Sequence, residues 1–116
     1  TDTNPRALDC ARKNLQNLGL ANRVQLHQQS LFLNESVDLV VCNPPWIPGR
    51  PSSRIEQGVF DENSGMTKAF LRGAVRVLNV GGEVWLVNSS YAEDVGLRDK
   101  GSLGLWAKQG GLEVIE

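Results

Sequence analysis

The sequence predicts an α/β fold built on a mostly parallel sheet, and three observations carry this prediction. Apolar residues recur at helical spacing near residues 5–18 and again near residues 70–78. Short apolar runs typical of buried strands lie between and after these segments, most clearly at residues 37–42 and 83–88. Helices and strands that alternate along one chain favour a parallel sheet with helices on its faces. Such a sheet binds ligands beyond the carboxyl ends of its strands.

The N-terminal part is predicted to form a helix and then a strand. Asn4 can cap the helix, Pro5 suits its first position, and Gly19 is a natural stop. Apolar residues at helical spacing mark the buried face of this helix: Leu8, Ala11, Leu15 and Leu18. Apolar and polar residues then alternate within residues 23–32, which indicates a strand.

The middle of the chain is predicted to supply a central strand and a functional loop. The apolar run from Val37 to Cys42 is broken only by Asp38, as expected for a strand that is covered on both faces. Residues 47–65 contain prolines, serines and glycines without clear periodicity. A loop of that length in a compact domain is usually functional or disordered.

The C-terminal part is predicted to continue the alternation. A second helix buries Phe70, Leu71, Ala74, Val75 and Leu78, and a glycine turn at residues 81–82 closes it. The next strand covers residues 83–88, a short helix follows at residues 103–108, and residues 112–116 begin a further strand. Trp85 and Trp106 are expected to be core residues.

Length and composition are those of one soluble globular domain. The 116 residues are 41% hydrophobic and 22% charged, and a net charge of -1 gives no overall basic signature for nucleic acid. Cys10 and Cys42 have no metal-binding spacing and follow no secretory signal, so we expect buried thiols in a cytoplasmic protein. The single His27 disfavours a metal site, and no apolar run approaches the ~20 residues of a membrane span.

The most informative stretch is "NPPW", residues 43–46, directly after the predicted central strand. Consecutive prolines cannot donate to a ladder, so the motif could be only a strand terminator. The alternative is a rigid rim that presents the Asn43 amide oxygen, the Pro44 carbonyl and the Trp46 ring to a ligand.

Together these segments resemble the class I S-adenosylmethionine-dependent methyltransferases, in particular the small-domain N-methyltransferase group that carries Asn-Pro-Pro-aromatic. Residues 1–14 look like the acidic end of the second strand and its helix. Residues 37–46 look like the fourth strand and catalytic motif, and residues 78–87 like the turn into the fifth strand. The resemblance implies a Rossmann-like fold and one methyltransferase domain over residues 1–116. It also implies that the first strand and its glycine-rich loop are absent, so a partial domain, inactive alone, is expected.

The resemblance implies a site for the cofactor S-adenosyl-L-methionine. Asp2 matches the acidic residue that accepts hydrogen bonds from both ribose hydroxyls, although a carboxylate near a helix N-terminus is also stabilised there without a ligand. Ser30, with Leu31 beside it, falls where many relatives have an acidic residue at the adenine amino group, and serine can still hydrogen-bond there. Asn43 completes the implied cofactor-binding set.

The resemblance also implies catalytic roles for Asn43, Pro44, Pro45 and Trp46. The Asn43 side-chain oxygen and the Pro44 carbonyl would accept the two hydrogens of an exocyclic nitrogen. Pro44 and Pro45 would hold these acceptors rigidly, and Trp46 would stack on the substrate. Methyl transfer would then be an in-line displacement from a sulfonium.

Three functions remain open. The leading one is N-methylation of a base in RNA or DNA, for which Arg50 and Arg54 could grip a phosphate backbone, although exposed arginines are more often simply solvated. The second is methylation of a protein glutamine amide. The third is a non-catalytic methyltransferase-like domain that binds RNA or supports a partner, against which the intact "NPPW" argues. The same loop also carries three acidic residues: Glu56, Asp61 and Glu62. One of them could line the substrate pocket, but a solvent-facing role is favoured.

Overall fold

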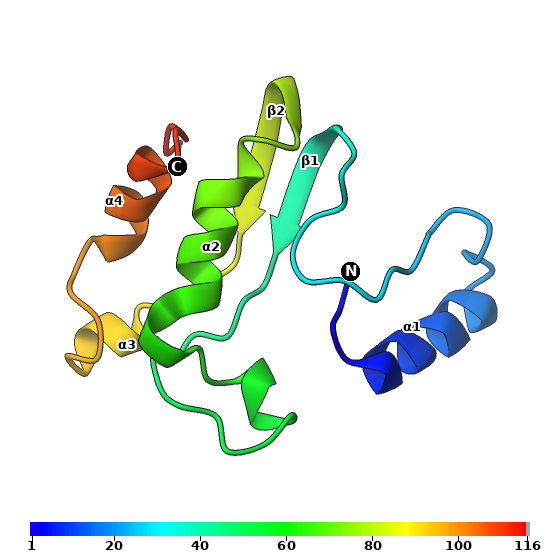
Figure 1. Ribbon diagram of the computed structural model, residues 1–116, viewed down its shortest axis with the longest axis horizontal. Coiled ribbons are helices and arrows are strands. Elements are labelled where there is room, and N and C mark those ends of the chain that lie inside the picture. The colour runs from blue at the N-terminus through cyan, green and yellow to red at the C-terminus, as the bar shows by residue number, and fades with distance from the viewer. Residues whose placement is uncertain (116) are drawn as a thin grey trace. The chain divides into compact units, whose positions relative to one another are not determined.

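The computed structural model describes residues 1–115, and the chain forms two compact units, Thr1–Asn34 and Glu35–Glu116 (Figure 1). The elements, in chain order, are α1 (Pro5–Asn17), β1 (Val37–Cys42), the 3₁₀ turns η1 (Glu56–Gly58) and η2 (Glu62–Ser64), α2 (Gly65–Ala74), β2 (Leu78–Leu86), α3 (Tyr91–Asp94) and α4 (Ser102–Gln109). Helices alternate with two parallel strands, which confirms the predicted α/β class and is consistent with a partial Rossmann-like fold.

The first unit contains the predicted N-terminal helix. The Asn4 side chain accepts a hydrogen bond from the Arg6 N–H at 3.0 Å, and Pro5 stands at the first helical position. Gly19 follows the end of α1 with a positive φ of 68°. Leu8 is buried, but Leu18 is 69% exposed, so the apolar stripe is only partly covered. The capping signals therefore set the bounds of this helix as predicted.

The predicted strand at residues 23–32 is wrong. The segment forms one isolated parallel bridge between Asp2 and Gln28, in which the Asp2 N–H donates to the His27 carbonyl at 3.2 Å and the Gln29 N–H donates to the Asp2 carbonyl at 3.1 Å. A strand needs a partner along its length, and in the first unit only Asp2 pairs with this segment. Alternation of apolar residues alone did not reveal this lack of a partner.

The second unit is built on the parallel pair β1 and β2, whose register runs from Leu39↔Glu83 to Cys42↔Leu86. Val37 pairs with Leu78, so residues 79–82 leave the ladder as a bulge within β2. Gly81 has a φ of +79°, a conformation that favours glycine. The predicted glycine turn therefore exists, but it interrupts β2 instead of preceding it.

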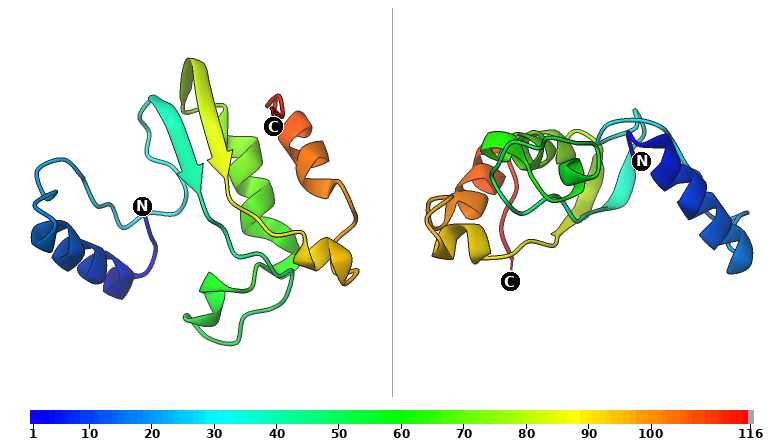
Figure 2. Two further views of the ribbon diagram at one scale, coloured as in Figure 1. Left: turned by 180° about the vertical axis from the view of Figure 1, so that it is seen from behind. Right: turned by 90° about the horizontal axis from the view of Figure 1, so that it is seen from below.

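Helix α2 covers one face of this sheet (Figures 1 and 2). Phe70, Leu71 and Ala74 are buried as predicted. Val75 is exposed, and Leu78 begins β2 instead of belonging to the helix, so these two parts of the prediction are wrong. The end of α4 packs closely on α2, since a Cβ at Gly110 would collide with the Leu71 carbonyl. These contacts form the core of the second unit.

The opposite face of the sheet is not covered by any helix of residues 35–115 (Figure 2). Val41 is 61% exposed and Trp85 is 58% exposed, and Leu39 on the same face is also exposed. The predictions that β1 is covered on both faces and that Trp85 is a core residue are therefore wrong for this structure. The strands are apolar as predicted, but within residues 35–115 a helix covers only one of their faces.

The C-terminal part differs from the prediction in two places. Helix α4 confirms the predicted helix at residues 103–108, and Trp106 is half-buried on it with the Lys68 ammonium 4.7 Å from its ring centroid. The short helix α3 was not predicted. Residues 112–115 form no strand, and the last residue of that predicted strand, residue 116, lies outside the described residues.

The two thiols differ in their surroundings. Cys10 is exposed on α1, so its predicted burial is wrong, while Cys42 is half-buried at the end of β1. Within residues 1–115, no helix is long and apolar enough to cross a membrane, and no cluster of three or more potential metal ligands occurs.

Candidate functional site

The motif at residues 43–46 begins where β1 ends. The Val87 N–H donates to the Cys42 carbonyl at 2.9 Å, just beyond the last paired residues of the two strands. Two prolines follow within the next three residues and cannot donate, so the ladder stops here. The motif thus lies at the carboxyl end of a parallel strand, the part of an α/β sheet where ligands bind.

The motif side chains are divided between the interior and the surface. Pro44 is buried, Asn43 is exposed, and Trp46 is 40% exposed. The indole Nε1–H of Trp46 donates a hydrogen bond to Oδ1 of Asn43 at 3.1 Å. A rigid backbone therefore presents an amide oxygen and an aromatic ring that are joined to each other.

The loop that follows is more ordered than the sequence indicated. The Ile47 N–H donates to the Val59 carbonyl at 3.3 Å, and the Asp61 N–H donates to the Ile47 carbonyl at 2.9 Å. Residues 48–58 are therefore a closed loop whose two ends are held together. Gly49 allows this closure, because a Cβ there would lie 2.8 Å from the Phe60 ring.

A pocket of about 260 Å³ opens between the motif and this loop. Its lining combines three motif residues with three loop residues: Asn43, Pro44, Trp46, Ile47, Gly58 and Val59. Sequence reasoning missed Gly58 and Val59, because only the backbone pairing of Ile47 with the segment around Phe60 brings them to the motif, whereas Ile47 directly follows Trp46 in the chain. The volume is near the lower end for small-molecule sites, so it suits one planar group better than a large ligand.

Asp61 is a structural residue of this loop. Its side chain accepts hydrogen bonds from the Met66 N–H at 2.8 Å, the Thr67 N–H at 2.9 Å and the Thr67 hydroxyl at 2.8 Å. It thereby satisfies free N–H groups in the first turn of α2. Asp61 is only 7% exposed, so the expectation that it faces solvent is wrong.

Most charged side chains of the loop are exposed. Hydrogen bonds from the Ser52 backbone N–H and then from its hydroxyl hold the pKa of the Glu56 carboxyl below its usual range. Arg50 and Arg54 are exposed, and neither forms an ion pair within residues 1–115. Cys42 lies directly before the motif. Burial raises the pKa of its thiol, so the thiol stays neutral.

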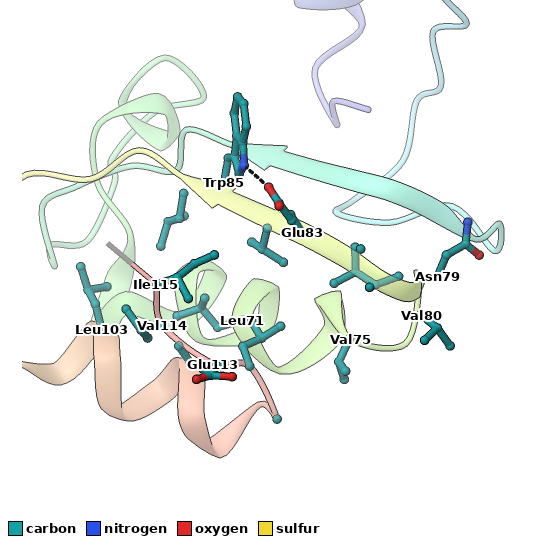
Figure 3. A pocket seen from close by; sticks show the side chains of 18 residues that line it. Leu71, Val75, Asn79, Val80, Glu83, Trp85, Leu103, Glu113, Val114 and Ile115 are labelled. Carbon is teal, nitrogen blue, oxygen red and sulfur yellow. Dashed lines mark hydrogen bonds between the residues drawn. The ribbon is translucent and has the colours of Figure 1, made fainter.

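A larger cavity of about 1000 Å³ lies between β2, α2, α4 and the C-terminal segment (Figure 3). Most of the side chains drawn there are apolar, among them Leu71, Val75 and Leu103. Glu83 also borders the cavity, and its carboxylate accepts a hydrogen bond from the Trp85 indole N–H at 2.9 Å. None of the predicted site residues lines this cavity.

The predicted cofactor residues of the first unit lie near one another. Oδ1 of Asp2 accepts the Asn4 N–H at 2.7 Å, and the adjacent Thr1 hydroxyl donates to the Leu31 carbonyl at 2.7 Å. Leu31 has a positive φ of 58°, which is costly for a bulky side chain and often marks a functional position. Asp2 and Ser30 are both exposed. Asn43, the fourth predicted cofactor residue, belongs to the second unit.

A protein-family model described as "UPF0020: RMKL-like, methyltransferase domain" matches residues 1–95. The chain belongs to this family. It is therefore a methyltransferase domain, and it needs a methyl donor, which for this class is typically S-adenosylmethionine. The matched residues include Asp2 and the whole loop that closes the 260 Å³ pocket. No curated protein and no solved structure matches the chain significantly.

Proposed function

We propose that this methyltransferase domain transfers a methyl group from S-adenosyl-L-methionine to a planar exocyclic nitrogen, with a base in RNA or DNA as the preferred acceptor. One observation carries the proposal. The side chains of Asn43 and Trp46 line a small pocket at the carboxyl end of β1, in a chain that belongs to a methyltransferase family.

The chemistry of such an acceptor explains the residue types. The lone pair of an exocyclic amine or amide nitrogen is delocalised into the neighbouring π-system, so the nitrogen is a poor nucleophile. Hydrogen bonds from its N–H groups to the Asn43 Oδ1 and the Pro44 carbonyl favour the positive charge that develops on nitrogen. The exposed face of Trp46 can stack on the planar group and align it.

The donor supplies an electrophilic methyl carbon on a positively charged sulfur. It would release this methyl group to the attacking nitrogen and keep the electron pair of the broken carbon–sulfur bond. The nitrogen then loses one proton to solvent, because an amide oxygen can accept a hydrogen bond but is too weak a base to keep the proton. Asn43 and Pro44 therefore stabilise and orient, and no covalent enzyme intermediate is needed.

The residues of the first unit fit a role in donor binding. Asp2 is exposed, and within residues 1–115 only its Oδ1 has a hydrogen-bond partner. Oδ2 is therefore free to accept a ribose hydroxyl, as a carboxylate in this position would. Ser30 is exposed as well and offers a hydroxyl that can serve as donor or acceptor to the adenine ring.

Two exposed cations support a nucleic acid as the acceptor. Arg50 and Arg54 lie on the loop that closes the pocket, and neither is paired with a carboxylate within residues 1–115. Free guanidinium groups beside an acceptor pocket suit phosphate contacts, which position a strand without reading its sequence. A protein glutamine amide presents the same planar NH₂ group but no phosphate.

The test is a kinetic comparison of wild type with Asn43→Ala in the full-length protein. We expect turnover to fall on the order of a hundredfold, as for removal of one preorganised polar group, with donor affinity nearly unchanged. Asn17→Ala, at the end of α1, is the matched control and should leave turnover unchanged. An Asn43→Ala enzyme with wild-type turnover would remove Asn43 from the mechanism.

A further inference from the structure

The hydrogen bond between the two side chains of the motif constrains the catalytic amide. An asparagine side chain has an accepting end, Oδ1, and a donating end, Nδ2. An indole N–H can only donate, so the 3.1 Å contact from Trp46 Nε1 requires that Oδ1 be the end that faces the ring. If the amide turned by 180°, two donors would face each other.

The backbone keeps this contact in place. Pro44 and Pro45 separate the two side chains and have restricted φ angles, and Pro44 is buried. The next residue, Ile47, restrains Trp46 as well, because the backbone of Ile47 forms hydrogen bonds with the backbones of Val59 and Asp61. The backbone is therefore restrained on both sides of Trp46, while Trp46 remains 40% exposed.

We infer that Trp46 is a positioning residue for Asn43, in addition to the stacking role of its ring. This inference rests on the proposed function and extends it. A carbonyl-type oxygen has two lone pairs, so Oδ1 can accept the Trp46 N–H and one N–H of the methyl acceptor together. The donating Nδ2 is then turned away from the acceptor nitrogen, which it would otherwise repel.

One substitution separates the positioning role of Trp46 from its stacking role. Trp46→Phe keeps an aromatic face but removes the N–H, so the Asn43 amide loses the contact that selects its orientation. We expect kcat to fall roughly 3- to 10-fold, the range for one neutral hydrogen bond, with KM for the acceptor changed less than twofold. Trp46→Leu removes the face as well and should also raise KM.

A second background makes the test specific. Asn43→Asp replaces the amide by a carboxylate whose two oxygens both accept, so its orientation no longer matters. In that background Trp46→Phe should change kcat less than twofold. An equal loss of kcat from Trp46→Phe in the wild-type and Asn43→Asp backgrounds would contradict the positioning role, as would an unchanged kcat when Trp46→Phe is the only substitution.

A spectroscopic measurement tests the contact without any activity. The chain has three tryptophans, and each gives one indole N–H signal in a ¹H–¹⁵N NMR spectrum. Asn43→Ala should move the Trp46 signal and speed its exchange with water, while the Trp106 signal stays. Glu83→Gln is the matched control and should move only the Trp85 signal, because Trp85 donates to Glu83.

The two measurements distinguish failure of this inference from failure of the proposed function. An unmoved Trp46 signal in Asn43→Ala would overturn the inference even in an active enzyme. If the wild-type protein methylates no nitrogen, the proposed function fails, and a shifted Trp46 signal still shows that the indole holds the amide.

Discussion

Asp61→Ala tests how the pocket loop is held. The substitution removes three hydrogen bonds, to the Met66 N–H, the Thr67 N–H and the Thr67 hydroxyl. Loss of a helix cap costs about 0.5–2 kcal/mol, and a buried polar group left unpaired costs about 1–3 kcal/mol. Thr67 is buried and would keep two unpaired groups. We therefore expect the free energy of unfolding to fall by about 3 kcal/mol.

Urea unfolding followed by circular dichroism measures this loss in the full-length protein. Asp61→Asn keeps one accepting oxygen and should lose about half as much stability. Glu62→Ala is the neighbouring control, and its change should stay within about 0.5 kcal/mol, because Glu62 is exposed and makes no side-chain hydrogen bond within residues 1–115. If Asp61→Ala and Glu62→Ala were equally stable, the structural role assigned to Asp61 would be wrong.

Three further predictions concern the pocket, the donor and the thiols. Gly58→Leu should fold normally, because a Cβ at Gly58 meets nothing within 4 Å. The larger side chain should narrow the pocket and raise KM for the acceptor severalfold. An unchanged KM would place the acceptor elsewhere. Asp2→Ala should weaken donor binding by about 1–3 kcal/mol in calorimetric titration with little effect on KM for the acceptor, and equal donor affinity would exclude a ribose contact. Iodoacetamide should modify exposed Cys10 before Cys42, because burial raises the Cys42 pKa and lowers its thiolate fraction; mass spectrometry of the labelled peptides would reveal the opposite order.

The local parts of the fold were predictable from the sequence because their signals are local. Asn4 and Pro5 define the start of α1, and the apolar run before Asn43 defines β1. The prolines that follow also revealed where β1 ends. Capping, helical periodicity and strand termination act within a few residues, so the sequence alone contains them.

The parts that failed depend on contacts between distant segments. Residues 23–32 have an alternating pattern but pair only at Gln28, and Trp85 is apolar but has no covering helix within residues 35–115. In the sequence, Asp61 is typical of a surface carboxylate. Its burial follows only from its hydrogen bonds to the start of α2. Gly58 and Val59 reach the pocket only through the bridge between Ile47 and Phe60.

The central claim is that the pocket at Asn43 directs a methyl group to nitrogen. Full-length protein should be incubated with radiolabelled S-adenosyl-L-methionine and total RNA, DNA or protein, and the labelled products should be digested to locate the modified atom. We predict label on an exocyclic nitrogen in one nucleic-acid fraction with wild type, and almost none with Asn43→Ala. Label on a glutamine amide in the protein fraction would support methylation of nitrogen but would identify a protein, and not a nucleic acid, as the acceptor. Label on carbon or oxygen, or equal labelling by Asn43→Ala, would contradict the account.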